Sequence, residues 1–179
     1  MAHQLSAQDW VDQGLKALAR SGFTALKADP LAKTMGVSRG SFYWHFADIG
    51  AFHAAILKHW REVAAEQVIA DLEAGETGED PLARLLTRVF SERLTLEKAV
   101  RSWASFDAPA RAAVQAIDRR RLDYLETMLK RSGVMPGAVP IRAQILYWTF
   151  LGVTFSDRPP PDDIRQALLD ELLRFARAG

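Results

Sequence analysis

The sequence predicts an all-α fold, with a three-helix head at the N-terminal end and a larger helical region after it. Three observations support this prediction. Apolar residues recur at helical spacing along the chain, and no stretch alternates as a half-exposed strand does. Gly and Pro separate the apolar stretches, as expected at helix ends. Residues 31–46 contain two short helical patterns on either side of Gly36, which is the arrangement of a helix-turn-helix.

The first helix is predicted to begin after Ser6 and to run to about Arg20, just before Gly22. Ser6 with Asp9 three residues later is a capping-box arrangement, in which each side chain accepts a hydrogen bond from the other residue's backbone N–H. The residues that share the apolar stripe of this helix, and that we expect in the core, are Trp10, Gly14, Ala17 and Leu18.

The helix-turn-helix is predicted over residues 27–46. Gly36 ends its first helix, because glycine alone adopts the left-handed backbone of a tight helix end at low cost. Ser38 is expected to cap the second helix with its hydroxyl oxygen. Phe42 and Phe46 are four residues apart and share a face, so we expect them to anchor this helix to the core.

The second helix of this unit has the chemistry of a DNA reader. Arg39 lies in its first turn, from which side chains reach base edges, and an Arg can donate two hydrogen bonds to guanine O6 and N7. Gly40 costs a helix interior roughly 1 kcal/mol relative to Ala, which a close approach of backbone to the duplex would explain. For each residue taken singly, a solvated surface position or ordinary packing is an equal alternative. The candidate DNA-binding residues are Lys27, Ser38, Arg39, Gly40, Ser41, Tyr43, Trp44 and His45.

These residues also carry a resemblance to a known family. The chain is similar to the TetR family of bacterial transcriptional regulators in its Gly22-Phe23, Leu31-Ala32 and Gly36-Val37-Ser38 and in the run from Ser38 to Phe46. The resemblance covers roughly the first third of the chain. One departure is Lys27, which stands where the family usually has a Thr or Ser cap. We expect Asp29 to replace that cap, with Pro30 opening the helix.

The resemblance implies a DNA-binding domain at residues 1–50 and a ligand-binding and dimerisation region at residues 51–179. It implies a regulator, by family default a repressor, that binds a palindromic operator in double-stranded DNA as a homodimer. A small-molecule effector of unknown identity would release it. The alternative is a protein that keeps this scaffold but acts through a protein partner, or that binds DNA without a small-molecule signal.

The rest of the chain is predicted as further helices, which gives about nine in all. Asp48 is expected to cap a long helix that reaches Leu72. After a loop at residues 73–79, Asp80-Pro81 opens the next helix. Later helices are predicted at residues 97–106, 109–131, 140–155 and 162–176, with a rigid break at residues 159–161.

Two apolar faces in this region have no evident partner in the chain, and the resemblance implies that a second copy covers them. The candidate dimer-interface residues are Ile145, Trp148, Leu151, Gly152, Ile164, Leu168, Leu172 and Phe175. Aromatic residues are candidates for a ligand pocket, although ordinary core packing is the alternative for each. They are Phe90, Trp103, Phe106, Tyr124, Tyr147 and Phe150.

Composition argues against several other classes of protein. The net charge is only +1, with the basic excess at the N-terminal end, and there is no cysteine for a disulfide or a thiolate metal site. No signal peptide is evident and no apolar stretch approaches the roughly 20 residues that span a bilayer, so a cytoplasmic protein without a membrane partner is expected. His53 and His59 are six residues apart, which does not place them on one helix face as a metal pair requires. Since phosphate-loop and nucleophile motifs are also missing, we expect no enzyme, no metal and no cofactor.

Overall fold

The computed structural model describes residues 5–75, 80–91, 94–158 and 160–177. Within these ranges the chain is helical and has no strand, which confirms the all-α prediction. Parts of the predicted loop at residues 73–79 and of the predicted break at residues 159–161 lie outside the described residues. The chain divides into two compact units, residues 1–64 with 94–116 and residues 65–93 with 117–179. The predicted boundary near residue 50 separates a DNA-binding part from a ligand-binding part. It is a boundary of function and stays a prediction.

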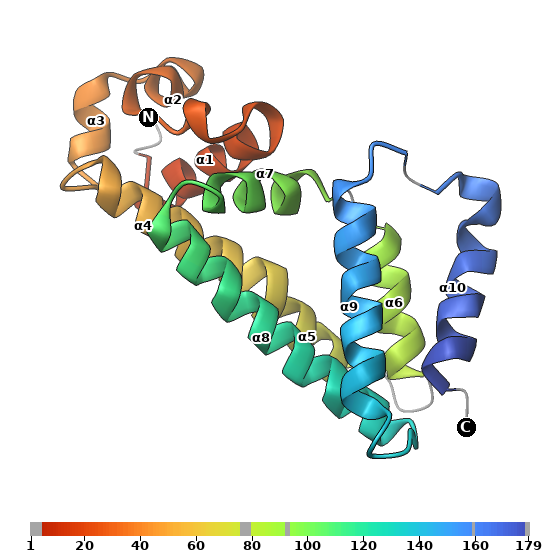
Figure 1. Ribbon diagram of the computed structural model, residues 1–179. Coiled ribbons are helices and arrows are strands. Elements are labelled where there is room, and N and C mark those ends of the chain that lie inside the picture. The colour runs from red at the N-terminus through yellow and green to blue at the C-terminus, as the bar shows by residue number, and fades with distance from the viewer. Residues whose placement is uncertain (1–4, 76–79, 92–93, 159, 178–179) are drawn as a thin grey trace. The chain divides into compact units, whose positions relative to one another are not determined.

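The first unit holds the predicted head. Its elements are α1 (Ala7–Ser21), the short η1 (Phe23–Ala25), α2 (Ala28–Met35), α3 (Arg39–Tyr43), α4 (Ile49–Arg61), α7 (Thr95–Ala104) and the start of α8 (Ala108–Arg131) (Figure 1). The capping box is confirmed, because the Ser6 hydroxyl accepts from the Asp9 N–H at 3.2 Å and the Asp9 carboxylate accepts from the Ser6 N–H at 2.7 Å. Helix α1 ends as predicted at Gly22, where φ is 74°.

An aromatic core joins α1, α3 and α4. The ring of Phe42 lies edge-on to Trp10 and to Phe52, with both centroid distances 5.3 Å, and Phe46 lies 5.1 Å from Phe52. Phe42 and Phe46 are both buried, which confirms them as the anchors of the second helix. Gly14 lets α1 approach α4 closely, because a Cβ there would lie 2.5 Å from the Ile56 Cδ1 atom. This core fixes α3 by one face and leaves its other face to solvent.

Helix α7 also belongs to this unit, although the sequence did not place it there. It packs along α1. Its Trp103 is buried, with its ring 4.9 Å from Phe23 and 5.4 Å from His53. The Nε2 atom of His53 lies 3.0 Å from the carbonyl oxygen of Leu26, so α4 is also tied to the segment that leads into α2. The helix-turn-helix is therefore supported by α7 as well as by α1 and α4.

The second unit contains α5 (Gln67–Glu73), α6 (Pro81–Ser91), the rest of α8, α9 (Val139–Phe155) and α10 (Asp162–Arg177). Helix α4 continues through a π-helical turn at Glu62–Glu66 into α5, which confirms the long helix predicted from Asp48. With this long helix counted as one and the short 3-10 turn η1 left out, the described part of the chain has nine helices. Ion pairs from Glu73 to Arg131 (2.9 Å) and from Glu66 to Arg120 (3.2 Å) hold α8 beside α5 and the π-helical turn, and α6 packs against α9 and α10 (Figure 1).

A search of the described residues finds no helix with the length and apolar character of a membrane span.

Candidate nucleic-acid interface

The turn between α2 and α3 has the predicted geometry. Gly36 is left-handed, with φ 69° and ψ 28°, and its N–H donates to the carbonyl of Lys33 at 3.3 Å. The N–H of Val37 donates to the carbonyl of Ala32 at 3.0 Å, so the end of α2 is closed by two backbone bonds. Ser38 stands in the N-cap position of α3 with extended backbone, but its hydroxyl makes no capping hydrogen bond. The predicted cap at Ser38 is therefore right in position and wrong in its side-chain bond.

The start of α2 differs from the prediction. Lys27 is the N-cap residue and makes no side-chain cap, while Asp29 lies inside the first turn. The carbonyl of Lys27 accepts from the Leu31 N–H at 3.3 Å, and both Ala28 and Leu31 are buried. The helical bond to the Lys27 carbonyl makes Ala28 the first helical residue, so the expectation that Asp29 caps α2 and Pro30 opens it is wrong. As a result the carboxylate of Asp29 is available for another contact.

Helix α3 is shorter than the predicted pattern. It ends at Tyr43, and the N–H groups of His45 and Phe46 both donate to the carbonyl of Phe42, at 3.0 and 3.1 Å. This turn lets Phe46 reach the core. The chain then enters α4 through Asp48, whose carboxylate accepts from the Ala51 N–H at 2.7 Å, as predicted for a cap.

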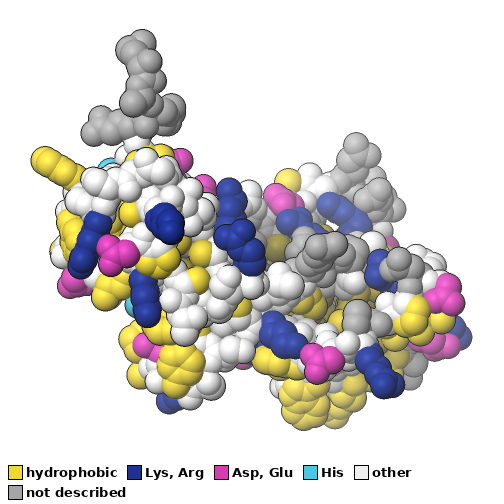
Figure 2. All heavy atoms as spheres, turned by 90° about the horizontal axis from the view of Figure 1, so that it is seen from above, with side chains coloured by type: hydrophobic (Ala, Val, Ile, Leu, Met, Phe, Trp, Pro, Cys, Tyr) yellow, Lys and Arg dark blue, Asp and Glu magenta, His cyan; other side chains and the backbone are white. Residues whose placement is uncertain are grey.

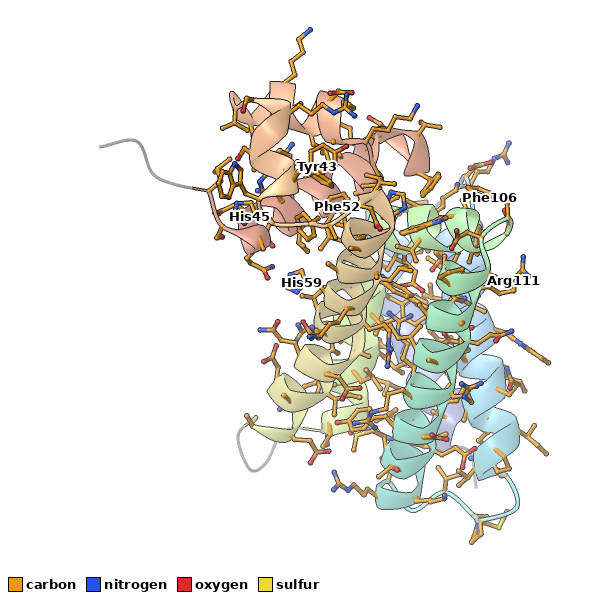
Figure 3. The ribbon with its side chains drawn as sticks, turned by 90° about the vertical axis from the view of Figure 1, so that its left-hand side faces the viewer. Tyr43, His45, Phe52, His59, Phe106 and Arg111 are labelled. Atoms are coloured by element: carbon orange, nitrogen blue, oxygen red, sulfur yellow. The ribbon has the colours of Figure 1, made fainter. Side chains whose placement is uncertain are left out.

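The outer face of α3 carries most of the candidate DNA-binding residues. Lys27, Ser38, Arg39 and Gly40 are exposed, and Ser41 and His45 are partly buried. Tyr43 is 49% exposed and Trp44 is 87% exposed, so neither is part of the core. Figure 3 shows Tyr43 and His45 at the end of this helix, with Phe52 at the adjoining start of α4. Their accessibility agrees with a contact surface, and the DNA contacts themselves stay a prediction.

Arg39 makes three contacts. Its Nη2 atom donates to the Tyr43 hydroxyl at 3.2 Å, and its guanidinium carbon lies 5.7 Å from the centroid of the Tyr43 ring. Its Nε atom lies 3.4 Å from a carboxylate oxygen of Asp29 on α2. The hydrogen bond to Tyr43 and then the charge of Asp29 raise the pKa of Arg39 above its ordinary value. Sequence reasoning missed Asp29, because the contact joins two helices.

The charge around this face is mixed. The candidate face includes two cations, Lys27 and Arg39, together with the acidic Asp29. Figure 2 shows Lys and Arg side chains lying singly among acidic and hydrophobic ones, without a continuous basic field on the face in view. A protein that binds DNA through phosphates alone usually has a more strongly basic surface than the face in view.

The six candidate pocket aromatics are divided between the units. Trp103 and Phe106 lie in the first unit, where Phe106 is 65% exposed and its ring lies edge-on to Phe23, with the centroids 5.4 Å apart. Phe90, Tyr124, Tyr147 and Phe150 lie in the second unit and are buried.

In the second unit, the rings of Tyr147 and Phe150 are 5.8 Å apart, and the Tyr147 hydroxyl donates to Asp118 at 2.7 Å. The Tyr124 hydroxyl lies 3.2 Å from Glu73, and burial raises the pKa of Tyr124 to about 12, with the charge of Glu73 adding to the shift. A hollow of about 500 Å³ opens elsewhere in this unit, and none of the six aromatics lines it. Its lining residues are Leu72, Asp80, Ala83, Arg84, Thr87 and Arg88. A ligand pocket lined by the candidate aromatic residues therefore stays a prediction.

The predicted dimer-interface residues form an uncovered apolar surface on α9 and α10. Trp148 is 62% exposed, and Ile145, Gly152, Ile164 and Phe175 are exposed as well. Leu151, Leu168 and Leu172 are partly buried. The structure adds the exposed Ile141 and Phe155, which continue the α9 stripe by one helical turn at each end.

In the described ranges, no group of three His, Cys, Asp or Glu residues has the geometry to hold a metal ion. His53 and His59 both lie on α4 and have separate partners. His53 contacts the Leu26 carbonyl, whereas His59 lies between Asp12 at 3.5 Å and Glu62 at 3.3 Å.

Comparison with known proteins supports a regulator. Residues 11–56 match the model of the bacterial regulatory proteins of the tetR family. No curated protein matches the sequence. Solved structures match the fold over nearly the whole chain. The reduced form of NemR from E. coli is 22% identical, with a TM-score of 0.68, and the match covers 96% of this chain and 93% of NemR.

Two further structures have the same fold. The transcriptional regulator FadR from Bacillus subtilis, in complex with stearoyl-CoA, is 18% identical with a TM-score of 0.62, over 95% of this chain and 97% of FadR. A TetR-family transcriptional regulator from Rhodococcus sp. is 16% identical with a TM-score of 0.66, over 95% of this chain and 97% of that protein. At such identities the likeness concerns the fold alone.

The helix-turn-helix, its aromatic anchors and its exposed second helix define a DNA-binding regulator of transcription. Residues 11–56 belong to the TetR family, and the chain as a whole has the fold of a TetR-family transcriptional regulator.

Proposed function

We propose that this chain is a transcriptional repressor that binds a palindromic operator as a homodimer and is released by a small molecule. The observation that carries the proposal is the division of α3 into two faces. Phe42 is buried among aromatic rings, while Arg39, Tyr43 and the adjoining Trp44 are exposed. A recognition helix needs such an anchored back and an accessible front to enter the major groove.

The exposed residues of this face divide into two roles. Arg39, in the first turn, pairs with a guanine and so selects sequence. Ser38, Ser41, Tyr43, Trp44, His45 and Lys27 offer donors to the phosphate and sugar backbone, which positions the helix without selecting sequence. Gly40 lets the backbone of α3 come close to the duplex.

A second copy of the chain covers the stripe on α9 and its neighbours on α10. Ile141, Ile145, Trp148 and Phe155 repeat at helical spacing and are all at least 40% exposed. A contiguous apolar surface of this kind marks an interaction site, and identical chains associate most often through a two-fold axis. Two reading heads related by that axis require a palindrome, with half-sites about 34–36 Å apart or a multiple of that spacing.

A small molecule releases the operator by binding the second region. Support comes from the likeness in fold to FadR, whose structure holds stearoyl-CoA. The buried aromatics Phe90, Tyr124, Tyr147 and Phe150 are the candidate contacts within the second unit. The molecule lowers DNA affinity only if it binds better to the conformation that does not fit DNA.

In this proposal residues 1–50 read DNA, residues 51–179 bind the effector and the second copy, and no reaction is catalysed. The protein acts where bacterial DNA is, in the cytoplasm.

The proposal is tested by selecting bound sequences from a random duplex library with the purified protein at low salt, where phosphate contacts are strongest. Enrichment of a two-fold symmetric motif supports a dimeric regulator. Absence of any enrichment, with the protein folded by circular dichroism, overturns the proposal.

A further inference from the structure

Asp29 and Tyr43 approach the guanidinium of Arg39 from two different helices. Asp29, in the first turn of α2, lies 3.4 Å from Nε. Tyr43, at the end of α3, accepts from Nη2 at 3.2 Å and has its ring 5.7 Å from the guanidinium carbon. The side chain is thus restrained by contacts along α3 and across the turn to α2.

These contacts use one edge of the guanidinium. Nε and Nη2 form the side-on edge of the fork, and Asp29 and Tyr43 engage both atoms. The other, end-on edge consists of Nη1 and the second N–H of Nη2. Such a pair of parallel donors matches the O6 and N7 acceptors of guanine. The protein contacts therefore leave Arg39 with the donor pair that a guanine requires.

The ion pair adds little to the stability of the fold. The side chains of Arg39 and Asp29 are 61% and 67% exposed, and surface pairs of this kind contribute little because water screens them. Asp29 does not cap α2 either. A carboxylate on a surface that meets phosphates also opposes binding to DNA in general. In the first turn of α2 this carboxylate also interacts favourably with the helix N-terminus, an effect that does not involve Arg39. Its effect on Arg39 is the one that bears on reading DNA.

We propose that Asp29 is a specificity-determining residue, which holds Arg39 for the end-on contact with guanine and opposes its pairing with phosphates. The inference rests on the proposed function. An Arg without this partner swings to the nearest phosphate oxygen, which is present at every sequence. Asp29 removes that option by its charge and by its hold on Nε. It therefore lowers affinity for DNA in general and raises the preference for one base pair in each half-site.

The test measures binding of the full chain by fluorescence anisotropy over a range of salt concentrations. Three probes are used: the selected operator, the operator with the Arg39-dependent guanine replaced, and a non-specific duplex. For Asp29→Ala we expect the preference for guanine to fall by about threefold to tenfold. We also expect tighter binding to the non-specific duplex and a steeper salt dependence, by up to about one counterion. Asp29→Asn keeps an acceptor but no charge. Its guanine preference should lie between those of wild type and Asp29→Ala.

Two controls separate this role from a general charge effect. Asp12→Asn removes one negative charge from α1 in the same unit, where Asp12 contacts Gln8 and His59 rather than Arg39, and should leave the guanine preference unchanged. In an Arg39→Ala background, Asp29→Ala should no longer affect the preference at that base pair. Thermal unfolding followed by circular dichroism shows that each variant folds.

The outcomes distinguish the inference from the function on which it rests. If wild type shows no sequence preference, the proposed function fails and the inference fails with it. If wild type prefers guanine and Asp29→Ala prefers it equally, only the inference is overturned. The inference is also overturned if Asp29→Ala changes the preference by the same factor whether or not Arg39 is present.

Discussion

Arg39 and Tyr43 lie one turn apart on α3, and the Tyr43 hydroxyl accepts a hydrogen bond from Arg39 Nη2 at 3.2 Å. A phenol hydroxyl both accepts and donates, so this bond leaves its own proton for a further acceptor. Tyr43 can therefore restrain Arg39 and donate to a phosphate oxygen at the same time. The base-reading and phosphate-binding parts of the surface share this side chain.

Tyr43→Phe should weaken binding to all DNA, on the order of threefold to tenfold, because a phosphate contact carries no sequence information. Loss of the hydrogen bond to Arg39 should add a smaller further loss at the operator. The ring remains and keeps its stacking on Arg39. Anisotropy titrations with the operator and with a non-specific duplex measure both affinities. A loss confined to the operator would contradict the phosphate role of Tyr43.

Gly40→Ala should stabilise the protein by about 0.5–1 kcal/mol and still weaken DNA binding about tenfold. Among the described residues no backbone conformation or close neighbour requires glycine at this position. Its φ is not positive, and a Cβ would meet only the Ser38 hydroxyl at an ordinary 3.6 Å. Urea unfolding and anisotropy measure the two effects. Unchanged operator affinity would show that the backbone of α3 does not approach the duplex at Gly40.

Trp148→Glu should convert the proposed homodimer into a monomer at micromolar concentration, because it places a charge on an apolar surface that has to be desolvated on association. Trp148 is 62% exposed within one chain, so the substitution disturbs no core packing. Met135→Glu is the matched control, since Met135 is 60% exposed but lies outside α9 and α10. Sedimentation velocity gives the mass of each variant. Equal dimerisation of wild type and Trp148→Glu would exclude this surface as the interface.

Tyr124 should make the stability of the second unit fall at alkaline pH. Its pKa is about 12 in the folded chain and 10.0 in its ordinary state, mainly because it is buried and secondly because of Glu73. Above pH 10 the unfolded chain loses this proton first, so the contribution of Tyr124 is complete below pH 10 and is lost as the pH rises toward 12. The loss amounts to at most roughly 3 kcal/mol.

Tyr124→Phe isolates this effect from the other groups that titrate at alkaline pH. Between pH 9 and about 11.5, wild type should lose more of its free energy of unfolding than the variant. Urea unfolding at each pH measures the difference. Parallel curves for the two proteins would contradict the raised pKa of Tyr124.

Local sequence signals predicted most of the fold. The capping box at Ser6, the cap at Asp48 and the left-handed glycine at position 36 each depend on residues a few positions apart. The start of α2 differs from the prediction, since the helix begins at Ala28 after Lys27, which makes no side-chain cap, in place of the capping residue Asp29. The π-helical turn at Glu62–Glu66 has no signal in the sequence that we can identify.

The exposure and burial of the candidate residues could be predicted from the sequence, and their arrangement less so. The exposure of Trp44 and the burial of Phe42 follow from helical spacing. The contact between Asp29 and Arg39 does not, because it joins neighbouring helices across a turn whose path sequence spacing does not fix. For the same reason the spacing does not predict that Trp103 packs on Phe23 in the first unit.

The central claim is that α3 reads bases through Arg39, and parallel selections with wild type and Arg39→Ala test it most directly. Wild type should enrich a two-fold symmetric motif that contains a guanine at one equivalent position in each half. Arg39→Ala should keep the rest of the motif and lose the preference at that position by about tenfold or more. The same motif with the same guanine preference from both proteins would contradict the claim.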